Sequence, residues 1–433
     1  MIGIIIGLAL LMYLAYRGLS IIWIAPLCAL VVAITGGLDL LPAYTEAYMG
    51  GFVNFTKLWF PVFMLGAIFG KVMEDSGAAQ SVAQWLTSKF GKKAAISAVV
   101  AGCAVLTFGG ISLFVVVFAM YPIALSLFRE ANITRKLIPG TIALGSFTFT
   151  MTAIPGTPQI QNLIPMQYFG TTATAAPIMG IVGAIIMCGG GIFYLEMRRK
   201  KYDSLGDFYD EPKDKVAEVD VSKLPNPILS ALPLLTVVTL LNADIIVETW
   251  NIDIIVALLA GILLGLALNI PRIESIKATL NQGASSSVIA IINTSAAVGF
   301  GSVVRAVPGF ATLTDLVMGI PGNPLISQAV SVNLLAGATG SASGGMGIAL
   351  EALGAQYLEI AQATGIAPEA FHRIASMASG GLDTLPHNGA VLTLLAVTAL
   401  THKDSYKEIF VVGSLIPIAA VISGIILGNF GLI

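Results

Sequence analysis

Asp383 and His387 form the acid and imidazole pair that is best placed for proton chemistry in this chain. They stand four positions apart in the polar stretch GGLDTLPHNG (380–389), which interrupts an apolar segment. That spacing puts two side chains on one face of a helix, although Pro386 between them favours local unwinding. A carboxylate and an imidazole can exchange a proton near neutral pH, so the pair is a candidate for proton coupling. The alternatives are that Asp383 caps the following half-helix and that His387 bonds to interrupted backbone.

Three further polar, glycine-rich stretches interrupt apolar segments in the same way: TFGGIS (107–112), MTAIPGTPQIQN (151–162) and ATGSASGGMG (338–347). A helix that resumes after such a break offers free N–H groups and the positive end of its dipole to an anion. None of the four stretches contains Lys or Arg, so we expect an anion to be held without a buried arginine. Hydroxyl and amide side chains add donors and acceptors for substrate hydroxyl groups.

The candidate substrate-binding residues are the glycines and polar side chains of these breaks: Thr107, Gly109, Gly110, Ser112, Thr152, Gly156, Thr157, Gln159, Asn162, Thr339, Gly340, Ser341, Ser343, Thr384 and Asn388. For any one of them the alternative is a packing role, because small residues let transmembrane helices approach closely. Packing does not require prolines beside polar side chains in both halves of the chain, which favours a shared binding site.

A few other charged residues lie near apolar segments. Glu351 either faces water or serves as a second proton-coupling carboxylate. Lys71 stands three and four residues before Glu74 and Asp75, so we expect mutual pairing on one helix face. Arg305 is expected to extend outward to the membrane surface.

Composition assigns the chain to the membrane proteins. Of its 433 residues 56% are apolar and 11% are charged, the mean hydropathy is +0.88, and apolar runs recur from end to end. We therefore expect an all-α, polytopic membrane protein. The net charge of −2 argues against a nucleic-acid partner, and the scattered cysteines Cys28, Cys103 and Cys188 predict no disulfide, metal site or cofactor. Nucleophile and metalloprotease motifs are absent, so we expect no enzyme.

Hydropathy predicts the membrane segments. The candidate spans are 2–16, 19–38, 58–75, 138–168, 174–195, 227–243, 252–269, 283–304, 371–400 and 408–430. Residues 94–128 and 326–355 are split near the middle into arms of about 13 to 17 residues, which is short for two spanning helices, so each is expected to be a re-entrant hairpin. Interrupted backbone at membrane depth must be covered by protein or line a water-filled cavity.

Basic residues predict the orientation, because Lys and Arg gather on the cytoplasmic side. With the N-terminus outside, one register places nearly all of them inside: Arg17, Lys89, Lys92, Lys93, Arg129, Arg135, Lys136, residues 198–201, Arg272, Lys277, Lys403 and Lys407. Both termini are then outside and the mixed-charge stretch 197–227 is cytoplasmic.

This register makes the two halves inversions of one another, as in many carriers. The expected organisation is a first membrane repeat at 1–195 with an inner hairpin at 94–128 and a broken helix at 138–168, a cytoplasmic linker at 196–226, and a second repeat at 227–433 with an outer hairpin at 326–355 and a broken helix at 371–400. The sequence similarity between the two halves is weak, so the prediction rests on the order of their elements.

Several strings resemble the gluconate:proton symporter family of bacterial permeases, within a larger ion-transporter superfamily: GKVMEDSGAAQSVAQWL, GGISLFVVVFAMYPIALSLFREANI and GGLDTLPHNGAVLTLL. The resemblance covers essentially the whole chain. It implies proton-coupled uptake of a small hydroxy-carboxylate through the cell inner membrane, by a homodimer whose transport domain slides against a scaffold in elevator fashion. It includes relatives for gluconate, other sugar acids and 3-hydroxybutyrate. The break TAIPGTPQIQN lacks the histidine- and proline-rich sequence of gluconate permeases at this place. This difference favours a smaller acid as the substrate.

Other functions stay open at this point. Unwound carbonyls and hydroxyls at 107–112 and 339–343 are equally suited to a sodium ion, so a sodium-coupled carboxylate symporter is the main alternative. A channel and a membrane-embedded enzyme are minor alternatives, because inverted repeats with facing hairpins suit alternating access better than a fixed pore.

Overall fold

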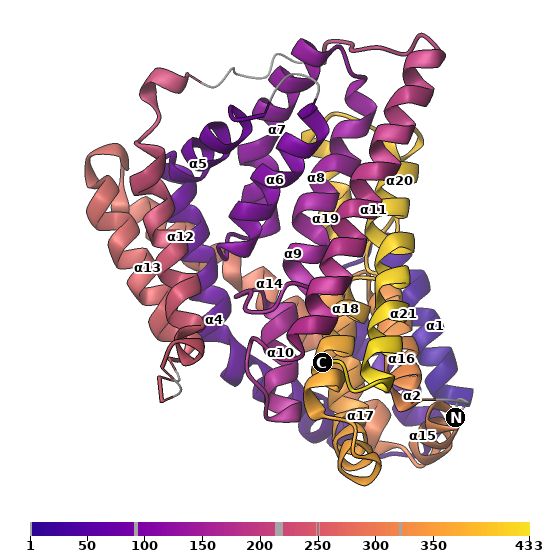
Figure 1. The fold of residues 1–433 in the computed structure, drawn as a ribbon. Coiled ribbons are helices and arrows are strands. Elements are labelled where there is room, and N and C mark those ends of the chain that lie inside the picture. Colours follow the sequence, from indigo (N-terminus) through magenta and orange to yellow (C-terminus); the bar gives the residue numbers. More distant parts are fainter. Residues whose placement is uncertain (1, 91–93, 213–219, 248, 251, 320–322) are drawn as a thin grey trace.

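The chain is helical throughout the part that the computed structural model describes, which is residues 2–90, 94–212, 220–247, 249–250, 252–319 and 323–433, and these residues contain no β-strand (Figure 1). Lys92 and Lys93, used above for orientation, lie outside these ranges. The helices before the linker are α1 (Ile2–Tyr16), α2 (Ile21–Gly36), α3 (Leu40–Pro42), α4 (Met49–Asp75), α5 (Ala78–Thr87), α6 (Ala95–Phe108), α7 (Leu113–Ala131), α8 (Ile138–Phe147), α9 (Phe149–Thr152), α10 (Ile160–Phe169) and α11 (Pro177–Ser204).

The second half repeats this order of elements. Its helices are α12 (Pro227–Leu241), α13 (Ile254–Asn269), α14 (Ile276–Ala306), α15 (Gly309–Met318), α16 (Pro324–Thr339), α17 (Ala342–Thr364), α18 (Pro368–Ser379), α19 (Gly389–Val397), α20 (His402–Phe410) and α21 (Ile416–Asn429). The π-helical turns η1 (Ala43–Tyr48) and η7 (Val411–Leu415) precede α4 and α21. In each half two helices, one long helix and one short helix precede a hairpin, a broken helix and a last long helix.

Helix lengths differ from expectation at several places. The span expected at 58–75 begins earlier, because α3, η1 and α4 run on from residue 40. Polar residues such as Glu46 lower the hydropathy there, which hid the helix. The second arms of the hairpins are also longer than the expected 13 to 17 residues, with 19 in α7 and 23 in α17. Helices α5 and α15 were not expected.

Six helical segments of the described chain are long and apolar enough to cross a membrane: Leu40–Asp75, Leu113–Ala131, Pro177–Ser204, Ile254–Arg272, Ile276–Ala306 and His402–Asn429. Shorter apolar helices accompany them at Ile2–Ala15, Ile21–Gly36, Ala95–Phe108 and Pro227–Leu241. Both termini lie in the lower part of Figure 1, and the described ends of the linker lie at the top.

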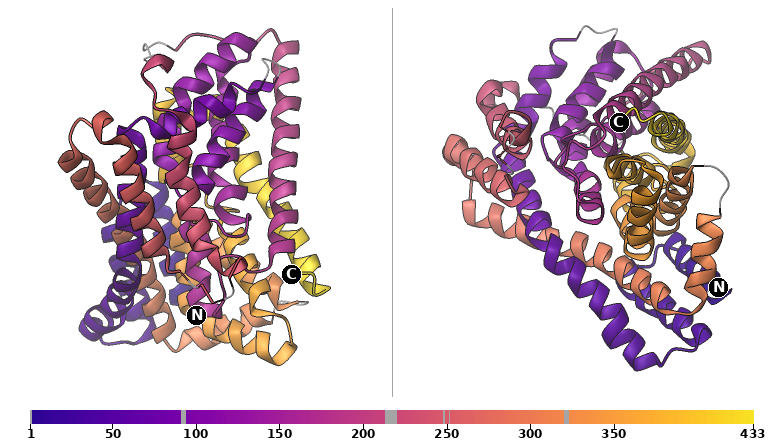
Figure 2. Two further views of the ribbon diagram at one scale, coloured as in Figure 1. Left: turned by 60° about the vertical axis from the view of Figure 1, so that its left-hand side comes forward. Right: turned by 60° about the horizontal axis from the view of Figure 1, so that its bottom comes forward.

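The long helices α4 and α14 pack along one another and form one side of the molecule (Figure 2, right). Small residues allow this approach, since a Cβ added to Gly283 would lie 2.7 Å from the Cα of Ile68. Thr56 and Ser295 share a 2.8 Å hydrogen bond across the same contact. Helices α2 and α13 pack against this pair, and α1 and α12 pack on them.

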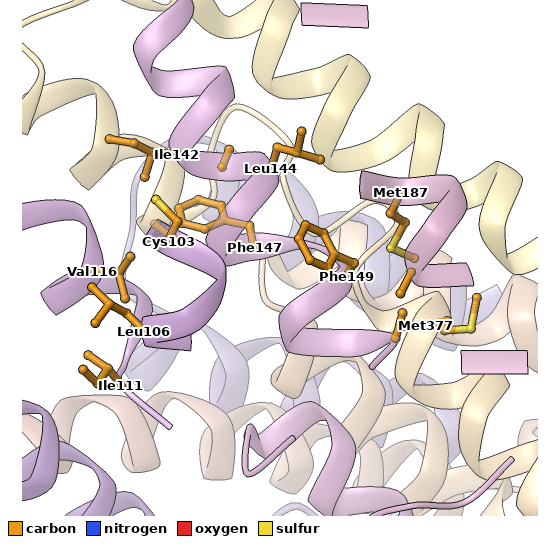
Figure 3. Packing of buried hydrophobic residues seen from close by; sticks show 14 of the residues in the cluster. Cys103, Leu106, Ile111, Val116, Ile142, Leu144, Phe147, Phe149, Met187 and Met377 are labelled. Carbon is orange, nitrogen blue, oxygen red and sulfur yellow. The ribbon is translucent and has the colours of Figure 1, made fainter. Parts of the chain in front are cut away.

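The first hairpin and the first broken helix share one apolar core. Figure 3 shows members of this buried cluster, including Cys103 and Leu106 of α6, Ile111 of the hairpin tip and Phe147 of α8. A Cβ added to Gly145 of α8 would lie 2.5 Å from the Cβ of Cys103, so this packing requires glycine. The hairpin therefore sits firmly against the helix whose interruption it faces.

The start of the linker binds the basic loop between α7 and α8. Asp207 pairs with Lys136 at 2.5 Å and accepts a hydrogen bond from Thr134 at 3.1 Å. The hydrogen bond from Lys136 to Asp207 raises the pKa of this lysine. The pairs Arg135–Asp210 and Arg129–Glu211 follow, each at 2.8 Å. This part of the linker is thus held on the protein rather than fully solvated.

A buried ion pair joins α11 to α20 and gives a stability test. Glu408 is 1% exposed and its Oε1 lies 2.6 Å from Nη2 of Arg198, with Tyr202 donating a further bond at 3.3 Å. We expect Glu408→Gln to cost roughly 3 kcal/mol, because it leaves the guanidinium without its counter-charge. Melting of the purified protein in detergent measures this, and Glu211→Gln at the exposed linker pair is the control. Equal melting temperatures for the two variants would contradict the prediction.

Candidate functional site

The tip of the first hairpin contacts the break in the first broken helix. Gln159, the N-cap residue of α10, donates from Nε2 to the carbonyl of Thr107 at 2.6 Å and to that of Ile111 at 3.3 Å. Gly110 at the tip has φ +93°, which favours glycine, and a Cβ added there would lie 3.2 Å from Pro158. The break therefore satisfies carbonyls that the hairpin turn leaves without helical partners.

The second hairpin meets the second break in the corresponding way. Asn388, the N-cap residue of α19, donates from Nδ2 to the carbonyl of Gly340 at 2.9 Å. Gly340 has φ +59°, and a Cβ added there would lie 2.7 Å from the ring of His387. In both halves, therefore, the side-chain amide of an N-cap residue donates to a carbonyl of the hairpin tip. The residue before the N-cap is Pro158 in the first half and His387 in the second.

The two breaks adjoin through the helices that lead into them. Ser376 of α18 donates to the carbonyl of Thr152 at 2.7 Å, and a Cβ on Gly380 would lie 2.9 Å from the methyl of Thr152. Beyond the breaks the half-helices cross over, since α10 packs on α17 of the second hairpin and α19 packs on α7 of the first. The structure thereby brings together residues that are more than 200 positions apart in the chain.

The half-helix N-termini differ between the halves. In the second half Ser341 caps α17 by accepting from Gly344 N at 3.1 Å, and Asn388 caps α19 by accepting from Val391 N at 2.9 Å. In the first half neither Ser112 nor Gln159 makes a side-chain cap on α7 or α10. The first half is therefore where the opening N–H groups of the half-helices lack a side-chain acceptor.

Two hydroxyls of the first hairpin tip and the first break also lack a partner among the described residues. Thr107 is 1% exposed and Thr157 is 0% exposed, and neither Oγ1 has a hydrogen-bond partner among the described residues. Thr157 lies two residues before the N-cap of α10, and the carbonyl of Thr107 is held by Gln159. Because a buried hydroxyl without a partner costs free energy, this pair is a candidate place for a polar ligand.

Asn162 of α10 uses the whole hydrogen-bonding capacity of its amide within the protein. Its Nδ2 donates to the carbonyls of Thr157 at 3.0 Å and Ala173 at 2.8 Å. Its Oδ1 accepts from Nη1 of Arg373 at 2.9 Å and lies 3.2 Å from Nε2 of His372. We infer that this predicted binding residue holds the break in shape rather than touching a ligand.

Arg373 is a buried residue that the sequence reasoning missed. Its guanidinium is 0% exposed, and besides Asn162 it donates to the carbonyl of Ala175 from Nε at 3.0 Å and from Nη2 at 2.7 Å. The expectation of a site without a buried arginine is therefore wrong for the surroundings of the first break. The signal was present, because Arg373 and His372 fall inside the predicted span 371–400.

Asp383 and His387 lie on turns rather than on one helix face, so the local unwinding that Pro386 favours is present. Residues 380–388 are not helical, which follows from Pro386 and the two leading glycines. Asp383 is 5% exposed and its Oδ1 has no hydrogen-bond partner among the described residues. His402 lies nearby, with its Nε2 3.0 Å from the carbonyl of Pro386.

Thr384 is bound by the π-helical turn that precedes α21. Its Oγ1 lies 2.8 Å from Oγ of Ser414, and its carbonyl accepts from Tyr406 at 3.2 Å. A Cβ added to Gly413 would lie 2.8 Å from Oγ1 of Thr384, so the turn is closely fitted to this residue. The hydroxyl of Thr384 is thus already engaged.

The remaining candidates lie on the same tips and breaks. Thr339 bonds back to the carbonyl of Leu335 in its own helix at 2.9 Å, and Ser343 lies 3.5 Å from Thr294 of α14. A Cβ on Gly109 would lie 2.6 Å from Leu234 of α12. Gly156 accepts at its carbonyl from Asn242 at the end of α12 at 2.9 Å. Helix α12 therefore supports the first tip and the first break.

Glu351 lies apart from these contacts, in a surface ion pair. Its carboxylate is 2.9 Å from Arg305 of α14 and accepts from Tyr168 of α10 at 3.3 Å. The side chain of Arg305 is exposed at the protein surface and also has a carboxylate partner that the sequence did not predict. These two residues and Glu46 line a cavity of about 330 Å³. The expected pairing of Lys71 with Glu74 and Asp75 is confirmed, at 3.5 and 2.9 Å.

Comparison with known proteins places this arrangement among transporters. An uncharacterized transporter of Bacillus subtilis, YxjC, is 45% identical and the match covers 96% of both chains. A gluconate permease of the same organism is 30% identical over 153 residues, which are 35% of this chain and 30% of that protein. The YdaH transporter of Alcanivorax borkumensis has a similar fold, with a TM-score of 0.62 at 14% identity, covering 91% of this chain and 90% of that one.

The family profile named GntP family permease matches residues 1–265, more than half of the chain. Together with the apolar helices and the transporter relatives, this match identifies a multi-pass membrane transporter and not an enzyme. The chain belongs to the GntP permease family.

Proposed function

We propose that this protein is a secondary carrier that brings a small hydroxy-carboxylate into the cell together with a proton. The observation that carries the proposal is the uncapped start of α7 and α10 beside the unpartnered hydroxyls of Thr107 and Thr157. Helix N-termini attract carboxylates, and hydroxyls match the hydroxyl groups of such an acid. The substrate class draws on the gluconate permease relative, with 3-hydroxybutyrate as the smaller candidate.

Asp383 and His387 are proposed to carry the coupling proton. They lie in the second break, which adjoins the first through Thr152 and Gly380. An ionised Asp383 would repel a carboxylate in the neighbouring break, and a proton on Asp383 removes that repulsion. Binding of proton and anion is then mutually favourable, which is what symport requires. Glu351 is a weaker candidate for carrying the coupling proton, because its carboxylate is already paired with the guanidinium of Arg305.

Sodium coupling remains the second candidate, and the tip carbonyls argue against it. The carbonyls of Thr107 and Ile111 accept from Gln159, and that of Gly340 accepts from Asn388. A sodium ion would need such oxygens as ligands, and here each of them already accepts a hydrogen bond from an amide, which lowers its capacity to bind a cation. We therefore favour the proton.

We propose that the protein lies in the cell inner membrane with the linker in the cytoplasm and both termini outside. Two observations support this orientation. The linker begins at the basic residues 198–201, and both termini lie at the opposite end of the molecule in Figure 1. In a homodimer the α4 and α14 side would serve as the scaffold along which the hairpins and broken helices slide. A cysteine at exposed Ser204 that labels from outside intact cells would reverse this orientation.

Uptake into proteoliposomes tests the function directly. Labelled gluconate, other sugar acids and 3-hydroxybutyrate are offered with proton and sodium gradients imposed separately. We expect saturable, uphill accumulation of at least one acid on the proton gradient alone. Accumulation that needs sodium would favour the alternative carrier, a non-saturating downhill flux would indicate a channel, and consumption of the acid would indicate an enzyme.

The variants Thr107→Val and Thr157→Val test the binding hydroxyls. Each removes a hydroxyl without a partner and keeps the shape of the side chain, so we expect the KM to rise roughly tenfold with little loss of stability. Thr141→Val is the control, because its buried hydroxyl bonds to the carbonyl of Leu137 in its own helix. A parent-like KM in both variants would remove these hydroxyls from the site.

The variants Asp383→Asn and His387→Gln test coupling. Asparagine keeps the size and hydrogen bonding of Asp383 but cannot titrate, so exchange across an equilibrated membrane should continue while the gradient-driven accumulation ratio falls close to one. His387→Gln should flatten the pH dependence of uptake between about pH 5 and 8. His402→Gln controls for the nearby second imidazole. If Asp383→Asn still concentrates substrate and His387→Gln keeps the parent pH profile, the pair is structural.

A further inference from the structure

Arg373 carries a buried charge that no acidic group balances. Its side chain is 0% exposed, and within the described residues no carboxylate comes within ion-pair distance of it. All its hydrogen bonds go to neutral acceptors: the carbonyls of Ala173 and Ala175 and the Oδ1 of Asn162. Arginine keeps its proton in proteins, so the surroundings of α18 hold one uncompensated positive charge.

The neighbouring histidine does not alter this balance. The Oδ1 of Asn162 can only accept, so Nε2 of His372 must carry the hydrogen of their 3.2 Å contact. The adjacent guanidinium disfavours a second positive charge, and in the neutral ring the other nitrogen, Nδ1, accepts from Oγ1 of Thr171 at 2.6 Å. Both ring nitrogens of His372 thus have partners without a second charge.

The charge lies close to the proposed anion site without opening onto it. Arg373 bonds to Asn162 at 2.9 Å, and Asn162 bonds to the carbonyl of Thr157 at 3.0 Å. The backbone carbonyl of Thr157, the residue whose hydroxyl lacks a partner among the described residues, is therefore linked to the guanidinium through two hydrogen bonds. Charges at such a separation in a protein interior still interact appreciably, because little water screens them.

A purely structural role does not explain the choice of residue. The carbonyls of Ala173 and Ala175 need donors, and a neutral amide supplies donors without placing a charge inside the membrane, as Asn162 and Asn242 do in the same loop region. Burying a charge is costly unless something offsets it. A bound carboxylate would be that counter-charge.

We propose that Arg373 is a positioning residue that makes the site selective for anions by supplying its positive charge from behind Asn162. This proposal rests on the proposed function as a carboxylate carrier. It adds which residue makes the site select anions over neutral molecules. The substrate carboxylate is held by backbone N–H groups and the hydroxyls of Thr107 and Thr157, and the charge of Arg373 favours it over an uncharged analogue of the same shape.

Binding of matched charged and neutral ligands to the purified protein tests this proposal. The probes are gluconate and 3-hydroxybutyrate, each compared with its amide, gluconamide or 3-hydroxybutyramide. For Arg373→Gln we expect the Kd of the carboxylate to rise about tenfold or more, while that of the amide changes little. Arg373→Lys should keep most of the preference for the carboxylate. Arg129→Gln, at the linker contact, should match the parent.

A second variant covers the case in which Arg373→Gln does not fold, as judged by size-exclusion chromatography. Asn162→Asp places a carboxylate against the guanidinium and neutralises its charge in place, although it also removes the two bonds that Nδ2 donates to the carbonyls of Thr157 and Ala173. The readout is therefore the carboxylate Kd relative to the amide Kd, and this preference should be lost in the same way. Equal losses for carboxylate and amide, or equal effects of lysine and glutamine at position 373, would show a structural latch and overturn the proposal. If the parent binds neither acid, the proposed substrate class fails first.

Discussion

The structure depends on one constraint, which is that backbone interrupted inside a membrane must find partners within the protein. Gln159 and Asn388 meet it at the two hairpin tips, where each N-cap amide donates to a carbonyl of the tip. Asn162 meets it inside the first break, and Asn242 reaches the same segment from α12. These side-chain amides are neutral and can both donate and accept, so they close the breaks without adding charge.

The same scaffold carries different chemistry in its two halves. In the first half the half-helices start without side-chain caps, and the nearby groups are hydroxyls with a buried arginine behind them. In the second half Ser341 and Asn388 cap their own helices, and the break carries an acid and an imidazole instead. A repeated fold thus provides two adjoining breaks of polar backbone, one with groups suited to an anion and one with groups that can carry a proton. Symport needs both close enough to influence one another.

Much of the fold could be predicted from the sequence, because apolar runs and glycine-rich breaks are local signals. The hairpins and broken helices lie within a few residues of their predicted places, except that α17 continues to Thr364. The helix from residue 40 was missed because polar residues such as Glu46 lower its hydropathy. The sequence could not predict which side chains bond to one another, because partners such as Arg373 and Asn162 stand 211 positions apart. The unwinding between Asp383 and His387 was predictable, because the proline between them is a local signal.

The packing also indicates where motion would be least costly. Each hairpin tip is bonded to the break of its own half, and the breaks are joined at Thr152, so these parts are suited to move as one body. These parts make few polar contacts with the long helix α14. Ser343 lies 3.5 Å from Thr294, and Glu351 forms a partly exposed ion pair with Arg305. An exposed ion pair contributes little free energy and re-forms readily in water. A displacement along α4 and α14 would therefore break few polar bonds to α14, although the bond from Asn242 at the end of α12 to Gly156 would have to open, while a separation of tip from break would remove the amide donors from the tip carbonyls.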